Sequence, residues 1–221
     1  MIDWSPLWLS LRVASWATVF SIVVGFAIAI PLSRRDLPGR SLFVGIANLP
    51  LILPPTVLGY GLLVALGART PVGRLYESLT GNSLVFTWQG AVVAACVASL
   101  PLFVSHARVA ISAVDHDVLD AARVDGADRK AILMKIVLPL ARPGLVAGTV
   151  LTFARALGDF GATLMVAGDT PGRTQTMPLA IYDAVMNDDL HTVSIFVALT
   201  LGICVAVTVL ASQCGGAAER T

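Results

Sequence analysis

The sequence has few charged residues and few cysteines. Only 13% of its 221 residues are Asp, Glu, Lys or Arg, whereas an average soluble domain carries about 25%. The net charge is +1, so the overall balance does not indicate a nucleic-acid partner. Cys96, Cys204 and Cys214 are far apart and have the spacing of neither a metal site nor a disulfide framework. We expect them to act as small apolar side chains.

Motifs of enzymes are also missing. The sequence has no GxxxxGK[ST] phosphate-binding loop, so any ATP, with its magnesium ion, must be bound by a partner. It has no HExxH, no paired-carboxylate site and no Ser/His/Asp arrangement. The three histidines, at positions 106, 116 and 191, fall at the borders of apolar runs. We therefore expect no enzymatic activity, no cofactor and no metal in this chain.

Long apolar runs dominate what is present. Hydrophobic residues make up 56% of the chain, and they fall in blocks of the roughly 20 residues that a membrane-spanning helix needs. We predict an all-α polytopic membrane protein with a single domain over residues 1–221. Its predicted spans are 9–32, 41–66, 84–113, 140–166 and 192–211. An odd number of spans places the two termini on opposite sides of the membrane.

Basic residues in the connecting loops indicate the orientation. On one side of the predicted spans lie Arg34, Arg35, Arg40, Arg108, Arg123, Arg129, Lys130, Lys135, Arg142 and Arg220. The other side has Arg69, Arg74 and Arg173. Because cytoplasmic loops are enriched in Lys and Arg, we expect the first side to be cytoplasmic. The N-terminus would then face the periplasm and the C-terminus the cytoplasm.

The second apolar run is interrupted by prolines and glycines. Pro50, Pro54 and Pro55 lie near its middle, and Gly59 and Gly61 follow. Irregular backbone at membrane depth is tolerated only against protein or a water-filled cavity. The run is therefore either part of a transport pathway, with Pro54, Pro55 and Gly59 as lining candidates, or a kinked packing helix. The residues themselves leave both interpretations open.

The most charged stretch of the chain is residues 115–139. Asp115 can cap a short helix, Gly126 can provide the left-handed turn that ends it, and Asp128 can cap a second helix. The second helix has an apolar side made of Ile132, Leu133, Ile136 and Val137. We predict two helices joined by a glycine turn and exposed to water, with small residues at 121 and 122 that let another protein approach closely.

This stretch resembles the EAA loop of ABC-importer permeases. The matching residues are Asp120, Ala121, Ala122, Gly126, Ile136, Leu138 and Pro139. Every spacing of the pattern is kept, and the one departure is Asp120 where the family usually has Glu. The resemblance implies that the stretch forms a coupling helix, which docks into a groove of a cytoplasmic ATPase subunit.

Other stretches resemble the molybdate permeases among these importers. They include DWSPLWLSLRVA, NLPLILPPTVLGYGLL, FTWQGA, ARALGDFGAT and TMPLAIY. The resemblance covers nearly the whole chain and implies a type I permease fold in the bacterial inner membrane. It also implies a homodimer, two ATP-binding subunits, a periplasmic binding protein and alternating access. Sulfate and thiosulfate permeases share the FARALGDFG-like stretch, so sulfate remains an alternative, and tungstate is a further tetrahedral dianion of this kind.

Two other classes of membrane protein fit the sequence less well. A secondary transporter or channel that works without ATP usually shows an internal repeat and several intramembrane charges. The sequence shows no repeat, and only Arg155 and Asp159 lie deep in a predicted span. An intramembrane enzyme needs nucleophilic or metal-binding residues that are missing here.

Arg155 and Asp159 are four residues apart, so on a helix they would share a face and pair. Family members often have Glu at the position of Asp159. One interpretation is a structural pair that neutralises itself. The other is that Arg155 meets the passing dianion while Asp159 either holds the arginine in place or repels back-flow of the anion. A structural pair should tolerate exchange of the two charges, whereas a pathway arginine should not.

Overall fold

The computed structural model describes residues 3–33 and 38–216, and within these ranges it contains helices and turns but no strand. The all-α prediction is confirmed. Arg34, Arg35 and Arg220 lie outside the described residues, as do the side chains of His116 and Cys214. Cys96 and Cys204 are free and half-buried.

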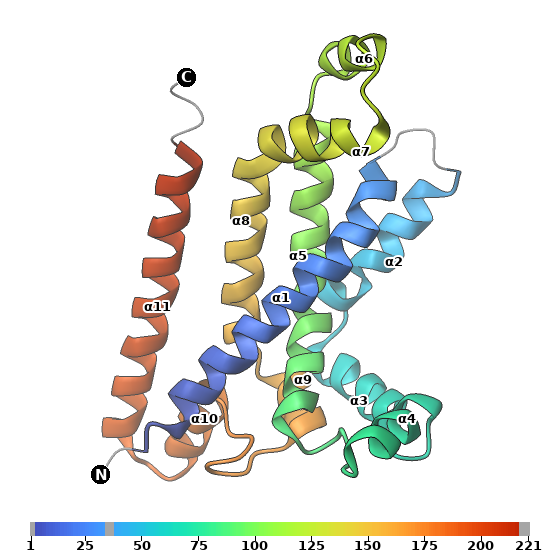
Figure 1. Ribbon diagram of the computed structural model, residues 1–221. Helices are drawn as coiled ribbons and strands as arrows, with labels where there is room; N and C mark the ends of the chain where they lie inside the picture. Colours follow the sequence, from blue (N-terminus) through green and yellow to red (C-terminus); the bar gives the residue numbers. More distant parts are fainter. Residues whose placement is uncertain (1–2, 34–37, 217–221) are drawn as a thin grey trace.

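Three long helices form the centre of the bundle: α1 (Ser5–Ser33), α5 (Trp88–Ser112) and α8 (Leu138–Leu157) (Figure 1). Small residues line their contacts, and Ala14, Ala17 and Ala95 are completely buried. Such residues let helix backbones approach closely, which is how helices associate in a membrane. Helix α11 (Leu190–Gly216) lies at the edge of the bundle, against α8 and α10 (Met177–Met186).

The second apolar run forms two helices instead of one. Helix α2 (Arg40–Ile52) and helix α3 (Pro55–Leu66) meet at an angle of 105°. The backbone leaves the helical region at Leu53 and Pro54 because each of them precedes a proline. Pro50 lies inside α2 and does not interrupt it, so the prediction that it breaks the run is wrong.

The fourth apolar run is also broken, which corrects the single span predicted for 140–166. Helix α8 ends at Leu157, three residues follow without helical structure, and a short helix α9 runs over Gly161–Ala167. Upstream, α8 continues from α7 (Arg129–Ile132) through a π-helical turn, η1 (Leu133–Val137). This turn precedes Pro139, which has no N–H to give to the carbonyl four residues earlier, so a wider turn relieves the conflict.

The connections between the predicted spans contain helices as well. Helix α4 (Pro71–Thr80) lies between the predicted spans 41–66 and 84–113, and α10 lies between the predicted spans 140–166 and 192–211. Residues 84–87 precede α5 as a turn, because the Thr87 side chain caps that helix by accepting the N–H of Gly90.

The guanidinium of Arg12 lies 3.7 Å from the centre of the Trp88 ring, and the side chain is exposed at the end of the bundle where α1 begins.

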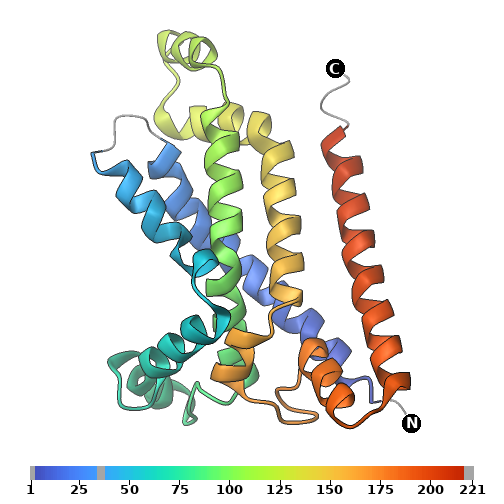
Figure 2. The same cartoon turned by 180° about the vertical axis from the view of Figure 1, so that it is seen from behind.

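Helix α1 begins and α11 finishes at opposite ends of the bundle (Figures 1 and 2). The described residues hold four helices long and apolar enough to cross a membrane, and a fifth crossing if α2 and α3 together make one. Helix α6 (His116–Val124) and α7 lie at the end where α11 finishes, and α3, α4, α9 and α10 lie at the other end. We call these the hairpin end and the N-terminal end.

Helices α3 and α9 pack closely because glycines lie at their contact. A Cβ added at Gly59 would lie 2.7 Å from Cβ of Met165 and 3.0 Å from Cα of Ala162. A Cβ added at Gly161 would lie 2.8 Å from Cβ of Pro55. Gly61 lies about half a turn further along α3, and a Cβ added there would meet nothing within 4 Å.

We therefore expect Gly59→Ala to lower the stability of the protein and Gly61→Ala to leave it unchanged or raise it. Overpacking typically lowers the free energy of unfolding by about 1 to 3 kcal/mol. Replacing an exposed helical glycine by alanine raises it by up to about 1 kcal/mol. The measurement is the midpoint of thermal unfolding of the detergent-solubilised chain, with size-exclusion chromatography as the readout of the folded fraction. Equal midpoints for the two variants would contradict the close contact of α3 with α9.

Candidate functional site

The residues singled out in the sequence fall into two regions of the structure. One is the helical hairpin α6–α7 at the hairpin end, and the other is a pocket beside the break between α8 and α9. The long helix α8 separates them, so the structure does not bring them together (Figure 1).

The hairpin is built by local capping interactions. Asp115 accepts the N–H of Asp117 at 2.9 Å, and Asp128 accepts the N–H of Ala131 at 2.7 Å. Gly126 has a φ of 83°, a conformation that residues with a Cβ rarely adopt. Beyond it, the N–H of Ala127 donates to the carbonyl of Ala122 at 3.0 Å, which closes a Schellman motif. The predicted helix, glycine turn and helix are therefore present.

One side of the hairpin is packed against the bundle and the other is exposed. Leu119 and Ala122 contact a buried cluster of Val114, Ile132 and Val137. Ala121 is exposed, so of the two small residues only this one faces fully outward. Apolar Val118 and Val124 are exposed as well, with Val124 at 87%.

The charged pair on α6 adds little to stability. Arg123 donates to Asp120 at 2.5 Å, and both side chains are 63% exposed. Exposed pairs of this kind contribute at most about 1 kcal/mol. The outer surface of α6 is thus a short helical face of small, apolar and charged groups that is free of contacts within the described residues.

The remaining residues of the pattern lie at the corner between the hairpin and the bundle. Ile136 is half-buried in the π-helical turn, and Leu138 and Pro139 form the first turn of α8. They do not belong to the exposed face of α6. Their position joins the hairpin to α8 in one continuous helical run over Arg129–Leu157.

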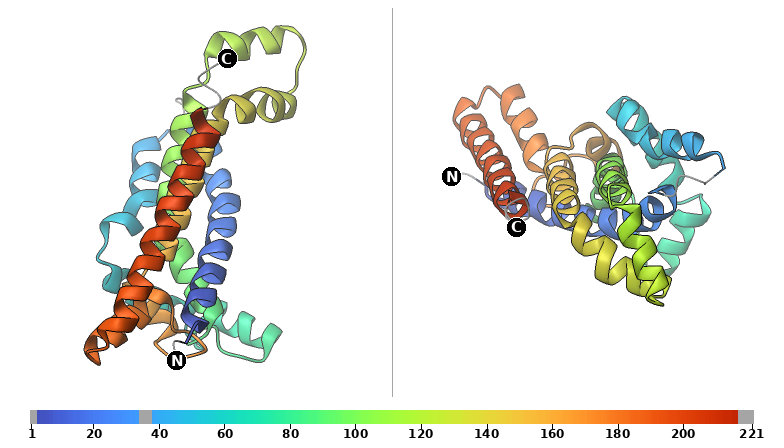
Figure 3. Two further views of the ribbon diagram at one scale, coloured as in Figure 1. Left: turned by 90° about the vertical axis from the view of Figure 1, so that its left-hand side faces the viewer. Right: turned by 90° about the horizontal axis from the view of Figure 1, so that it is seen from above.

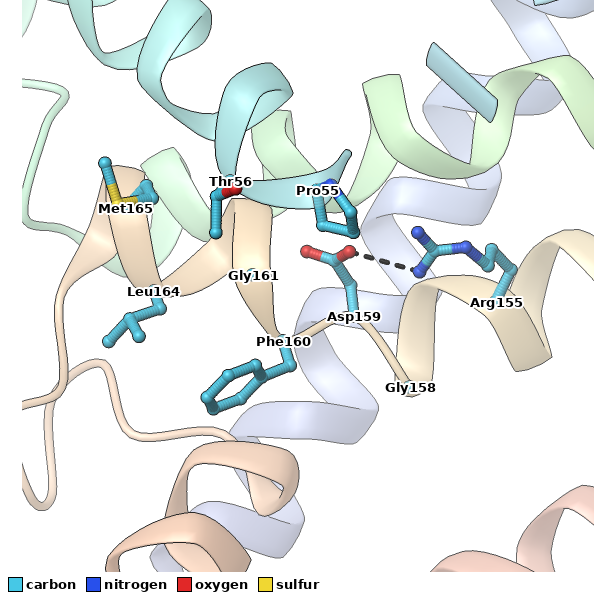
Figure 4. A pocket seen from close by; sticks show the side chains of 9 residues that line it. All are labelled: Pro55, Thr56, Arg155, Gly158, Asp159, Phe160, Gly161, Leu164 and Met165. Atoms are coloured by element: carbon cyan, nitrogen blue, oxygen red, sulfur yellow. Dashed lines mark hydrogen bonds and ion pairs between the residues drawn. The ribbon is translucent and has the colours of Figure 1, made fainter. Parts of the chain in front are cut away.

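A pocket of about 310 Å³ lies between the start of α3 and the α8–α9 break (Figure 4). Its lining consists of Pro55, Thr56, Arg155, Gly158, Asp159, Phe160, Gly161, Leu164 and Met165. Among the pathway candidates, Pro55, Arg155 and Asp159 line it. Pro54 and Gly59 do not: Pro54 precedes α3, and Gly59 is a packing residue between α3 and α9.

Arg155 and Asp159 pair as the sequence predicts, with a distance of 3.1 Å from the arginine to Oδ1. They do not share a helix, because α8 ends between them. The other oxygen of Asp159, Oδ2, accepts both the N–H of Thr163 at 2.9 Å and its hydroxyl at 2.7 Å. Asp159 therefore connects the last turn of α8 to the first turn of α9.

The two members of the pair differ in their surroundings. The Asp159 side chain is 1% exposed and uses both of its oxygens, whereas the Arg155 side chain is 31% exposed beside the pocket. A guanidinium has five N–H donors, and in the described residues Arg155 uses one of them. The pocket thus has a cationic group with donors to spare, next to a carboxylate that is fully occupied.

Sequence reasoning missed Thr56, Phe160 and Thr163. Thr163 lies in a run that reads as one continuous span, so no pattern marks it as the partner of Asp159. Among the described residues, no group of three or more His, Cys, Asp or Glu side chains is close enough to hold a metal ion.

Comparisons with known proteins agree on one family. The family described as "binding-protein-dependent transport system inner membrane component" matches residues 21–214. Molybdenum transport system permease protein ModB of Escherichia coli (strain K12) is 46% identical over 181 residues, which is 81% of this chain and 79% of that protein. ModB of Haemophilus influenzae is 41% identical over 178 residues, covering 80% of this chain and 78% of that protein.

Solved structures agree on the fold. A chain of the MetNI methionine ABC transporter in inward facing conformations aligns with a TM-score of 0.74 at 17% identity, covering 96% of this chain and 94% of that one. A chain of a bacterial alginate ABC transporter aligns with a TM-score of 0.72 at 13% identity, covering 98% of this chain and 79% of that one. The predicted permease fold of ABC importers is confirmed.

The hydroxyl of Thr163 generates a prediction about the pocket. Thr163→Val removes the shorter of the two bonds to Oδ2 of Asp159 and keeps the shape of the side chain. Since a lost hydrogen bond to a buried charged group costs about 1 to 3 kcal/mol, we expect a lower midpoint of thermal unfolding, and we expect Thr163→Ser to restore it. Equal midpoints for the wild-type, Val and Ser proteins would show that this hydroxyl does not hold the break together.

Proposed function

Because the chain belongs to the family of binding-protein-dependent transport system inner membrane components, we propose that it is the membrane-spanning permease subunit of an importer of molybdate. The identity to ModB proteins over four fifths of the chain is the observation that carries this proposal. These relatives are named for molybdenum and not for sulfate, which favours molybdate over the sulfate alternative.

A permease of this family is a transport subunit and works with an ATPase and a binding protein. We propose that the ATPase is cytoplasmic and holds the ATP and magnesium, since the sequence has no phosphate-binding loop of its own. We also propose that the chain forms a homodimer. A bundle of five crossings is small for walling a pathway, and two-fold pairs are the commonest assemblies.

The exposed face of α6 is our proposed docking surface for the ATPase. The preformed, capped hairpin supports this role, because a helix held at both ends can transmit force without reordering. The packed face of Leu119 and Ala122 fixes it to the bundle. Asp120, Ala121 and Gly126 belong to the docking segment itself, and Ile136, Leu138 and Pro139 to its connection with α8.

The orientation follows from the same assignment. If the ATPase binds α6, the hairpin end is cytoplasmic, and the N-terminal end with α3, α4, α9 and α10 faces the periplasm (Figure 1). Arg123, Arg129, Lys130, Lys135 and Arg142 then lie on the cytoplasmic side, which agrees with the enrichment of basic residues there.

We propose that Arg155 contacts the oxyanion in the pathway. A tetrahedral dianion accepts hydrogen bonds, and Arg155 offers a positive charge with uncommitted N–H donors beside the pocket. Asp159 would hold the arginine in place, since its own oxygens are occupied by Arg155 and Thr163.

Exchange of the two charges does not separate a pathway role from a structural role. An arginine at 159 would face the N–H of Thr163, which can only donate, and the Thr163 hydroxyl, which could accept one hydrogen bond but carries no negative charge. The exchanged protein would therefore be destabilised whichever role Arg155 has. Substitutions at Arg155 alone are the informative ones.

The first functional prediction concerns Gly126. In proteoliposomes that contain the ATPase and the binding protein, we expect molybdate uptake to require ATP and to be lost in Gly126→Val. The β-branched side chain disfavours the left-handed conformation of the turn, so α6 would no longer be presented to the ATPase. Gly126→Asn is the matched control, because Asn tolerates this conformation.

Co-purification of the ATPase with the chain is the second readout, and we expect it to be weakened only in the Val variant. If Gly126→Val transported normally and retained the ATPase, the hairpin would not be the coupling surface. Uptake independent of any added ATPase would instead reject the importer assignment.

The second functional prediction concerns Arg155. We expect Arg155→Gln to reduce molybdate uptake by about tenfold or more, because a lost charge-assisted hydrogen bond costs about 1.5 to 3 kcal/mol, and Arg155→Lys to restore part of it. The ATPase activity of the assembled complex and its chromatographic profile serve as controls for folding. Normal uptake by Arg155→Gln, with only a lower unfolding temperature, would make the arginine a structural residue.

A further inference from the structure

Helix α4 lies outside the pocket and the hairpin. It is located at the N-terminal end, runs across the bundle and projects from one side of it (Figure 3). Both of its ends are capped: the hydroxyl of Thr70 accepts the N–H of Gly73 at 3.0 Å, and the N–H of Gly81 donates to Glu77 at 2.8 Å. Gly81 has a φ of 73°, the left-handed conformation of a helix C-terminus. A helix of ten residues is only marginally stable by itself. The two caps help to stabilise α4 and fix where it begins and ends.

One side of α4 is attached to the end of α3. Gly73 is buried, and a Cβ added to it would lie 2.2 Å from the carbonyl oxygen of Gly67. Tyr76 packs against the cluster that contains Leu66 and Leu84. Any force on α4 is therefore passed to α3, whose first turn lines the pocket.

A second side of α4 is apolar and uncovered. Val72, Leu75 and Leu79 are 53%, 62% and 77% exposed, and their spacing of three and four residues places them in one stripe. Arg74, Glu77 and Ser78 are exposed on the remaining side. The helix thus has a packed sector, an apolar sector and a polar sector.

Position in the molecule indicates what covers the apolar stripe. Val57, Tyr60 and Val64 of α3 are exposed as well, and α3 leads into α4 through residues 67–70. At the same end of the bundle, Trp4, which precedes α1, and Trp8, in its first turn, are exposed. Tryptophan is enriched at the membrane–water interface. An apolar stripe beside a charged sector, on a helix that runs across the bundle at this level, is the arrangement of an interfacial helix.

We propose that α4 lies in the membrane interface, with Val72, Leu75 and Leu79 among the lipid acyl chains and Arg74 and Glu77 at the headgroups. The partner is the lipid surface, not a second protein. In this position α4 holds α3, and with it one wall of the pocket, at a constant depth in the bilayer. The proposal requires a membrane-spanning chain but does not depend on the transported anion.

Spin labels on α4 test this placement in the full chain reconstituted in phosphatidylcholine and phosphatidylglycerol vesicles. Single cysteines replace Leu75 and Leu79 in the apolar sector, and Arg74 and Ser78 in the polar sector. Cys96, Cys204 and Cys214 are first changed to Ala, and assembly with the ATPase confirms that this background is folded. Power saturation then measures collisions with oxygen, which partitions into lipid, and with a water-soluble nickel chelate.

We expect the ratio of oxygen to nickel collisions to be several-fold higher at 75 and 79 than at 74 and 78. Nickel collisions that are equally frequent at all four positions would place the apolar stripe in water and overturn the proposal. Labels at 75 and 79 that neither reagent reaches would show burial against protein, as in a contact with a second copy or with the binding protein, and would overturn it as well. Failure at this step would leave the Gly126 and Arg155 experiments unaffected.

Discussion

The carboxylate of Asp159 is the group on which the geometry of the pocket depends. It is buried at the end of a membrane-spanning helix, where an unpaired charge or an unbonded backbone N–H is costly. Its oxygens accept from Arg155, from the backbone N–H of Thr163 and from the Thr163 hydroxyl. One side chain thus compensates a charge on α8 and an orphan donor in the first turn of α9, and this allows the helix to break where it does. Without this carboxylate, the break would leave the charge of Arg155 and the N–H of Thr163 without their partner.

The break at Asp159 has a counterpart in the other interrupted run. Leu53 and Pro54 end α2, and α3 then turns away by 105° to pack against α9. Glycines make this packing possible, since a Cβ at Gly59 or Gly161 would collide with the opposite helix. The pocket lies where these two irregular segments meet. Asp159 in the α8–α9 break is buried, whereas Leu53 and Pro54 are exposed, so protein covers only one of these two irregular segments. The rule for segments at membrane depth allows irregular backbone against protein or beside a water-filled cavity.

The sequence predicted the features that local chemistry decides. Asp115, Gly126 and Asp128 specify the hairpin by capping and by a left-handed turn, and each acts there as predicted. The long apolar runs predicted the bundle, because length and hydrophobicity suffice to identify a span. What failed depends on contacts distant from the pattern. Residues 140–166 form one long and mainly apolar run, so the pattern does not indicate that a helix ends at Leu157. Gly59 is a lining candidate in the sequence, whereas in the structure it packs against Met165.

The hairpin and the pocket are mechanically connected through one helical run. Residues Arg129–Leu157 run without interruption from the cap at Asp128 to the turn that carries Arg155. In Figure 1, α7 and the π-helical turn lie across the end of α8. At about 1.5 Å per residue, α8 alone is roughly 30 Å long, enough to reach across a bilayer. A displacement of α7 therefore moves the Arg155 end of α8 unless something along the run bends. The π-helical turn before Pro139 is the weakest point, because its wider hydrogen-bonding pattern is the least stable part of the run. How far motion at the hairpin reaches Arg155 thus depends on the stiffness of that turn, which Leu133 and Val137 secure by packing on the same cluster that holds α6.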